Sequence, residues 1–273
     1  MPAVLSRRNC FDTFSTSSRI VPHTPINTMS NPALTIKLEP VASGVARPSA
    51  GTTPLVIEKD GQSAWLHIPQ NASAGPLPLL VVLHGAGKGT YWTLEEGHMS
   101  VSDWAGRANK HGCAVLYPAA RGSTWDYISS GRKEHKDFEF VTHAINTARR
   151  TVPIDDRRIA LLGISDGGSM ALSLVSHNPK VFQAAMSISA GFCSDPPCAA
   201  PGAPKMFIKH GAADSMFPLK RVGLPLRDKL VALGYEVEHR VGKGDGGIFG
   251  PAGHVPPGWQ EEFLPAWLAM GVE

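Results

Sequence analysis

Short apolar segments alternate with helical segments along most of the chain, and this alternation restricts the possible fold more than any other feature. Continuous apolar runs are typical of strands buried on both faces of a sheet. One such run occurs at 76–85, and mostly apolar segments that also read as strands occur at 113–120, 157–165, 182–191 and 205–211. Helical spacing of apolar residues occurs at 98–112, 137–153, 166–179, 219–234 and 257–271. The order predicts an α/β fold with a mostly parallel central sheet and helices on both faces.

The edges of this sheet are predicted from two further segments. Residues 53–69 read as two strands joined at Asp60-Gly61, a dipeptide typical of tight hairpin turns. Residues 235–244 alternate apolar and polar side chains and read as a last strand. Residues 37–273 are therefore predicted to form one domain.

Residues 1–36 differ from the rest of the chain in composition. They contain Arg7, Arg8, Arg19 and many serines and threonines, but Asp12 is their only acid, and they lack the apolar block of a secretory signal. Three interpretations stay open: an organelle transit peptide, a disordered extension, or a start codon placed too early with Met29 as the true beginning. We expect a cytoplasmic protein, or a mitochondrial or plastid one if the segment is a transit peptide.

The overall charge excludes some classes of partner. There are 26 basic and 23 acidic side chains, for a formal net charge of +3, which is too even to predict binding to nucleic acid or to an anionic membrane surface. No segment reaches the roughly 20 apolar residues of a membrane helix. We expect a protein without a membrane span, and a monomer by default.

The four cysteines do not form a metal-binding pattern, since none has a C-x-x-C neighbour. Cys113 lies in an apolar run, as a small buried residue would. Cys193 and Cys198 bracket the segment SDPP, whose two prolines bend the chain. Either a loop disulfide or two free thiols fits this pattern, and a disulfide would require an oxidising compartment.

A candidate nucleophile lies between a predicted strand and a predicted helix. Residues 163–167 read Gly-Ile-Ser-Asp-Gly, a G-x-S-x-G motif centred on Ser165. A serine in such a sharp strand-to-helix turn has strained backbone angles and projects its hydroxyl above the sheet. Glycines two residues away on each side are needed because side chains there would collide with the neighbouring elements. We predict that Ser165 is a catalytic nucleophile rather than a structural serine.

A serine hydroxyl needs a base, which is itself oriented by an acid, and in this fold class the order is Ser, acid, His. Asp214 follows the strand 205–211 directly, at the edge of the sheet where parallel sheets build their sites. His254 lies in the loop before the last helix and is surrounded by glycine and prolines, which hold it outside regular structure. Asp245 is the alternative acid. His239 is the alternative base, although it lies inside an alternating strand.

The oxyanion of an acyl-transfer intermediate needs backbone N–H donors. One donor is predicted at Asp166, directly after the nucleophile. The second is predicted at Ala86, in the loop 84–87 that follows the strand 76–85. The side chain of His84 is expected to shape this loop rather than to transfer protons.

Five ordered motifs, LLVVLHGAG, RGSTWD, IDDRRIALLGISDGGSMAL, IKHGAADSMFP and GHVPP, resemble the phospholipase/carboxylesterase branch of the α/β-hydrolases over residues 50–271. The chain is also similar to acyl-protein thioesterases and polyhydroxybutyrate-depolymerase-like esterases. The resemblance implies a nucleophile at Ser165, an acid at Asp214 and a base at His254. It also implies a substrate pocket lined by Gly85 and Trp125, although plain core packing is an alternative for Trp125. The glycine-rich segment GKGDGGIFGPAG before His254 is longer than the resemblance leads one to expect.

The expected activity is therefore hydrolysis of a small carboxylic ester through an acyl-enzyme on Ser165, with no metal or organic cofactor. Thioesters and amides pass through a similar tetrahedral intermediate, so a thioesterase or a peptidase with the same triad stays open. A ligand-binding protein that keeps the hydrolase pocket without turnover is a further alternative.

Overall fold

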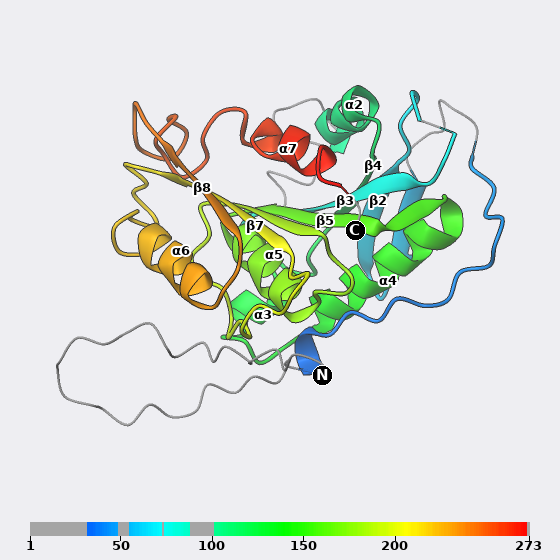
Figure 1. Ribbon diagram of the computed structural model, residues 1–273, viewed down its shortest axis with the longest axis horizontal. Helices are drawn as coiled ribbons and strands as arrows, with labels where there is room; N and C mark the ends of the chain where they lie inside the picture. The colour runs from blue at the N-terminus through cyan, green and yellow to red at the C-terminus, as the bar shows by residue number, and fades with distance from the viewer. Residues whose placement is uncertain (1–31, 49–54, 73, 88–100, 272–273) are drawn as a thin grey trace, which may run out of the picture.

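The computed structural model describes residues 32–48, 55–72, 74–87 and 101–271 (Figure 1). Most of the predicted extension 1–36 therefore lies outside the described residues, and so does the predicted helix start at 98–100. Leu34 and Ile36, at the end of the predicted extension, are buried in the core. The first of them lies in a short 3-10 helix, Pro32–Leu34.

The centre of the molecule is one eight-stranded sheet in the order β1-β2-β4-β3-β5-β6-β7-β8. The edge strands β1 (Leu55–Lys59) and β2 (Gln62–His67) are antiparallel, and β2 also runs antiparallel to β4. The other strands are parallel. They are β3 (Leu77–Leu83), β4 (Ala114–Pro118), β5 (Ile154–Ile164), β6 (Ala184–Ile188), β7 (Lys205–Gly211) and β8 (Val237–Gly242). The predicted fold class is confirmed.

Helices cover both faces of this sheet (Figure 1). One face is covered by α4 (Lys136–Thr151), α5 (Asp166–His177) and α6 (Gly223–Ala232), with the short helix α3 (Asp126–Ser129) nearby. The other face is covered by α2 (Val101–His111) and α7 (Leu264–Leu268).

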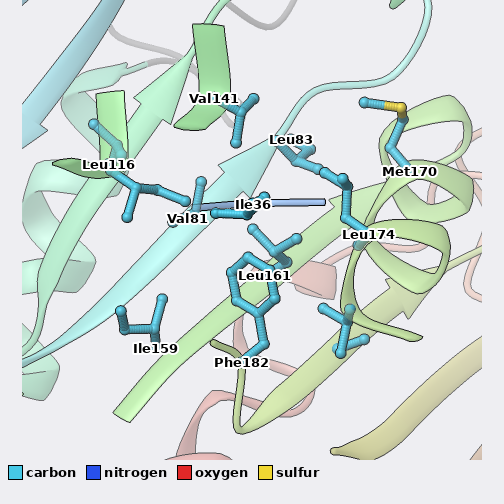
Figure 2. Close-up of a cluster of buried hydrophobic side chains, with 14 of the residues drawn as sticks. Ile36, Val81, Leu83, Leu116, Val141, Ile159, Leu161, Met170, Leu174 and Phe182 are labelled. Atoms are coloured by element: carbon cyan, nitrogen blue, oxygen red, sulfur yellow. The ribbon is translucent and has the colours of Figure 1, made fainter. Parts of the chain in front are cut away.

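The core has two clusters, one on each face, because successive side chains of a buried strand point to opposite sides. In β5, Leu161 belongs to the cluster beneath α4 and α5, whereas Leu162 belongs to the cluster beneath α2 and α7. Figure 2 shows the first cluster, where Val81 and Leu161 of the sheet face Val141 of α4 and Leu174 of α5. Continuous apolar strands are therefore explained by burial on both faces.

Two local predictions have different outcomes. The Asp60-Gly61 hairpin is confirmed: both residues have positive φ, 53° and 76°, as tight hairpin turns require. The continuous helix predicted over 257–271 is wrong. A 3-10 turn, Trp259–Glu261, and the short α7 replace it, because Gly258 has a φ of 69° and Pro265 has no N–H to extend a preceding helix.

The strand order changes direction next to β3, and this change brings the carboxyl ends of two strands together. From β3 the chain passes through α2 to β4 on one side, then returns through α4 to β5 on the other side. The carboxyl ends of β3 and β5 are therefore neighbours, at the kind of switch point where open parallel sheets bind ligands.

Candidate active site

Ser165 lies in the sharp turn between β5 and α5. Its φ of 54° and ψ of −119° are strained values for a residue with a side chain. The sheet fixes this conformation, since the Ser165 N–H donates to the carbonyl of Ile188 at the end of β6 (N···O 2.8 Å).

Three glycines allow the strained turn to pack. A Cβ at Gly163 would be 2.1 Å from the carbonyl oxygen of Gly167, and a Cβ at Gly167 would be 2.2 Å from that of Leu83. A Cβ at Gly168 would be 2.9 Å from the Ser187 hydroxyl. The first two distances are impossible for real side chains, so the backbone of α5 lies directly against the ends of β3 and β5.

Ser165, His254 and Asp214 form one hydrogen-bonded chain. The Ser165 hydroxyl lies 2.9 Å from Nε2 of His254, and Nδ1 of His254 lies 2.8 Å from Oδ2 of Asp214. The three residues are 7%, 2% and 4% exposed. The distances fit a hydroxyl that donates to Nε2 while Nδ1–H donates to the carboxylate, which is the arrangement that activates a serine.

The carboxylate of Asp214 is held in its charged form. Burial alone would raise its pKa, but the hydrogen bond with His254 and those from the backbone N–H groups of Phe217 and Met216 keep the pKa below its usual range. A charged Asp214 can stabilise an imidazolium on His254 during proton transfer. The alternative acid, Asp245, is exposed, and the alternative base, His239, lies on β8 opposite Ile208.

His210 is a buried group beside Asp214 that sequence reasoning missed. Its ring is fully buried, with Nε2 2.5 Å from the carbonyl oxygen of Phe217 and 3.4 Å from Oδ2 of Asp214. Nδ1 is buried with no partner among the described residues, and the backbone of Gly223 packs on that side of the ring. The geometry therefore fits a neutral ring whose Nε2–H donates to the Phe217 carbonyl. The signal in the sequence was its place at the end of a buried strand, four residues before Asp214.

The burial of the His210 ring predicts that the protein loses stability in mild acid. Burial lowers the pKa of His210 below 6.5, although the Phe217 carbonyl and Asp214 partly oppose the shift and His254 adds to it. Below about pH 6.5 the unfolded chain binds a proton that the folded protein does not. The free energy of unfolding should therefore fall by up to about 1.4 kcal/mol per pH unit for this group.

Urea unfolding at several pH values between 7.5 and 5.0 measures the effect. His210→Gln keeps an N–H for the Phe217 carbonyl but does not titrate. Below pH 6.5, its free energy of unfolding should therefore depend less steeply on pH than that of the wild type, by an amount equivalent to at most one proton. His67 and His239 also have pKa values lowered by burial, so part of the slope should persist. Identical slopes in the two proteins would contradict the prediction.

The loop that follows β3 lies next to the turn that holds Ser165. A Cβ at Gly167 would meet the carbonyl oxygens of both Leu83 and His84, so the start of α5 touches this loop. Gly85 is buried and Ala86 is exposed. Among the residues that the structure describes, the backbone N–H groups of Ala86 and Asp166 have no acceptor, whereas the N–H of Gly87 donates to the carbonyl of Ser123.

The segment 120–126 holds this loop in place. The indole Nε1–H of Trp125 donates to the carbonyl of His84 (2.8 Å), and the two rings stack with centroids 4.6 Å apart. The Ala120 N–H donates to Nε2 of His84 (2.9 Å). Thr124 donates from its hydroxyl to the carboxylate of Asp166 (2.5 Å). The expected shaping role of His84 fits these contacts.

Trp125 was predicted to line the substrate pocket, with plain core packing as the alternative. Its side chain is fully buried, and its indole supports the 84–87 loop through the His84 carbonyl. This burial fits the packing alternative, and a contact with substrate stays a prediction. RGSTWD reaches the loop because it follows β4, whose end is adjacent to that of β3.

Trp125→Phe should lower kcat for ester hydrolysis about tenfold with little change in KM. The variant keeps the aromatic ring but leaves the His84 carbonyl without its donor, and a displaced oxyanion donor costs at most about 10²- to 10³-fold. Trp104→Phe is the matched control, since Trp104 is equally buried but lies in the cluster on the other face. Equal losses in the two variants, measured with p-nitrophenyl acetate, would indicate a general packing effect.

The remaining sequence predictions concern cysteines, metals and membranes. Cys113, Cys193 and Cys198 are free thiols, and burial raises the pKa of Cys193 to about 12, which makes it unreactive. No group of three or more potential ligand side chains that could hold a metal ion occurs among the described residues. Within the same residues, none of the helices is both long and apolar enough to span a membrane.

Comparison with known proteins agrees with the fold. The sequence profile of the Prolyl oligopeptidase family matches residues 100–194. A thermostable esterase of known structure superimposes with a TM-score of 0.61 at 22% identity, over 79% of this chain and 62% of that one. S-formylglutathione hydrolase from Staphylococcus aureus superimposes with a TM-score of 0.57 at 17% identity, over 81% of this chain and 98% of that one. The chain has the α/β-hydrolase fold.

A curated relative of this chain is a bifunctional acetylxylan esterase/xylanase from Neocallimastix patriciarum. The two sequences are 27% identical over 175 residues, and the match covers 59% of this chain but only 23% of the relative. The chain thus spans about a quarter of that protein's length.

Proposed function

We propose that this α/β-hydrolase cleaves small, uncharged carboxylic esters through an acyl-enzyme on Ser165. The observation that carries the proposal is the continuous chain of hydrogen bonds from Ser165 through His254 to Asp214 in a buried site. His254 would take the proton of the Ser165 hydroxyl as the serine attacks the ester carbonyl, and Asp214 would stabilise the imidazolium that forms.

The N–H groups of Asp166 and Ala86 are the proposed oxyanion donors. Both lie where the start of α5 meets the end of β3, and among the described residues neither has another acceptor. His254 would then donate its proton to the leaving alcohol, and water would release the acid by the same sequence of proton transfers in reverse order. The acyl-enzyme stage needs only groups that the chain itself supplies.

Peptidase activity is the second candidate, and the match to the Prolyl oligopeptidase profile favours it. An amide would use the same nucleophile, base and acid, but it has a poorer leaving group. A p-nitrophenyl ester and a p-nitroanilide of the same acyl group separate the two activities, because only a peptidase should also cleave the anilide in a Ser165-dependent manner. We expect cleavage of the ester alone.

The experiment that tests the proposal is covalent labelling combined with turnover. The wild-type protein should release p-nitrophenol from p-nitrophenyl acetate and butyrate, and a fluorophosphonate should add once, at Ser165, as mapped by peptide mass spectrometry. Labelling without turnover would favour the ligand-binding alternative. Labelling elsewhere, or turnover that survives the loss of Ser165, would overturn the proposal.

A further inference from the structure

Exposed apolar side chains gather on the two loops that carry Asp214 and His254. Among the described residues, six large hydrophobic side chains are exposed, and three of them lie on these loops: Met216 (54% exposed), Ile248 (48%) and Phe249 (66%). The other three are distributed over β1, α6 and β8. We call Met216, Ile248 and Phe249 the apolar rim.

Backbone contacts join the two loops to each other and to the candidate base. Asp214 and Gly247 form an isolated parallel β-bridge. The His254 N–H donates to the carbonyl of Gly247 (3.1 Å), and the Val255 N–H donates to that of Ile248 (2.6 Å). Ile248 and Phe249 therefore directly follow Gly247, whose carbonyl accepts the hydrogen bond from the backbone of His254.

The backbone of the exposed loop that carries Ile248 and Phe249 packs closely on itself and on Ala213. A Cβ at Gly246 would be 2.6 Å from the Cβ of Ala213, and one at Gly250 would be 2.2 Å from the carbonyl oxygen of Asp245. A Cβ at Gly253 would be 2.6 Å from the carbonyl oxygen of Gly247. These close approaches explain the unusually glycine-rich segment before His254. The backbone beneath the apolar rim is fixed in advance, which lowers the entropy cost of binding.

Charge restricts what the apolar rim can bind. Residues 246–260 contain no lysine, arginine, aspartate or glutamate, and in 211–219 the single such residue is the buried Asp214. The charged residues of the two loops lie outside these stretches, at Lys220, Arg221, Lys243 and Asp245. An apolar group bound at the apolar rim would remove exposed hydrophobic surface from water.

Geometry indicates which part of an ester lies on this side. Nε2 of His254 lies 2.9 Å from the Ser165 hydroxyl oxygen, and the base that accepts the serine proton then donates it to the leaving oxygen. The leaving alcohol is therefore on the side of His254. We propose that the apolar rim binds the alcohol portion of the substrate, and that this hydrolase prefers esters of uncharged apolar alcohols. This inference rests on the proposed esterase function.

Two matched ester series test the inference. Ethyl, butyl and hexyl acetate vary the alcohol, whereas ethyl acetate, butyrate and hexanoate vary the acyl group, and acid release is followed by pH-stat. For the wild type, kcat/KM should rise along the alcohol series. In the double variant Ile248→Ser/Phe249→Ser, kcat/KM for hexyl acetate should fall about tenfold through KM, equivalent to about 1.4 kcal/mol, while ethyl acetate changes less than about twofold.

Val231→Ser is the matched control, since Val231 is 53% exposed on α6, away from both loops, and should leave every rate unchanged. Equal losses for ethyl and hexyl acetate, or a loss confined to the acyl series, would overturn the inference. So would a wild-type dimer that the double variant dissociates without a change in selectivity, because the occupant of the apolar rim would then be a second copy of the chain.

Failure of the inference and failure of the proposed function give different results. If the wild type hydrolyses no ester in a Ser165-dependent manner, the proposed function fails. If it hydrolyses both series but the double variant keeps the wild-type alcohol preference, the esterase proposal stands and the apolar rim does not bind the alcohol.

Discussion

Ser165→Ala should lower kcat for p-nitrophenyl butyrate by about 10⁶-fold, the loss seen when an activated serine is removed from a comparable triad. The structure supplies the reason, since the Ser165 hydroxyl oxygen lies 2.9 Å from Nε2 of His254, where a base can remove its proton as it attacks a carbonyl. Alanine removes Oγ alone, and the turn keeps its backbone bond to Ile188.

The measurement is steady-state release of p-nitrophenol, with an active-site titration of the wild type to count functional sites. Ser169→Ala is a suitable control, because this buried serine lies one turn into α5 and its hydroxyl bonds backbone groups rather than His254. A residual rate in Ser165→Ala within about 100-fold of the wild type would mean that a different group is the nucleophile.

Asp214→Asn should lower kcat by about 10⁴-fold with little change in folding. An asparagine oxygen can still accept from the backbone N–H groups of Met216 and Phe217, so the turn keeps its bonds. Its amide nitrogen would then face His254 as a donor, and the imidazole would have to carry its proton on Nε2. That tautomer cannot accept the serine proton.

The matched control is Asp245→Asn, which alters the exposed alternative acid on the neighbouring loop. It should retain wild-type kinetics, and thermal unfolding of both variants should stay close to that of the wild type. A large loss in Asp245→Asn with a small one in Asp214→Asn would reverse the proposed assignment of the acid.

Much of the architecture could be predicted because each buried strand has a local signature. Continuous apolar runs such as 79–83 are incompatible with any exposed face, and the glycines around Ser165 indicate a turn that no side chain could enter. The three groups of the candidate triad could be proposed because each follows a predicted strand or lies in a proline- and glycine-bounded loop.

What could not be predicted depends on contacts between distant segments. Trp125 supports the loop at His84, 41 residues away in sequence, and no local pattern distinguishes that contact from a pocket wall. His210 lies in an apolar strand, so the sequence alone does not distinguish it from an ordinary core residue. Its role depends on the contact between its ring and the carbonyl of Phe217, in the turn after the strand. The prediction of one continuous last helix was wrong for a local reason. It relied on the spacing of apolar residues and did not take into account that Pro265 interrupts a helix.

The strained turn at Ser165 links the reactivity of this residue to the correct folding of the sheet. Because the Ser165 N–H bonds the carbonyl at the end of β6, the strained conformation of Ser165 depends on the correct alignment of β5 and β6. Under the proposed acyl-enzyme mechanism, the amplitude of a stoichiometric burst of p-nitrophenol would therefore count the molecules in which these two strands have their native register. In a refolding experiment, the burst amplitude would recover as the parallel sheet assembles. Molecules with native helices but a shifted register between β5 and β6 would give no burst.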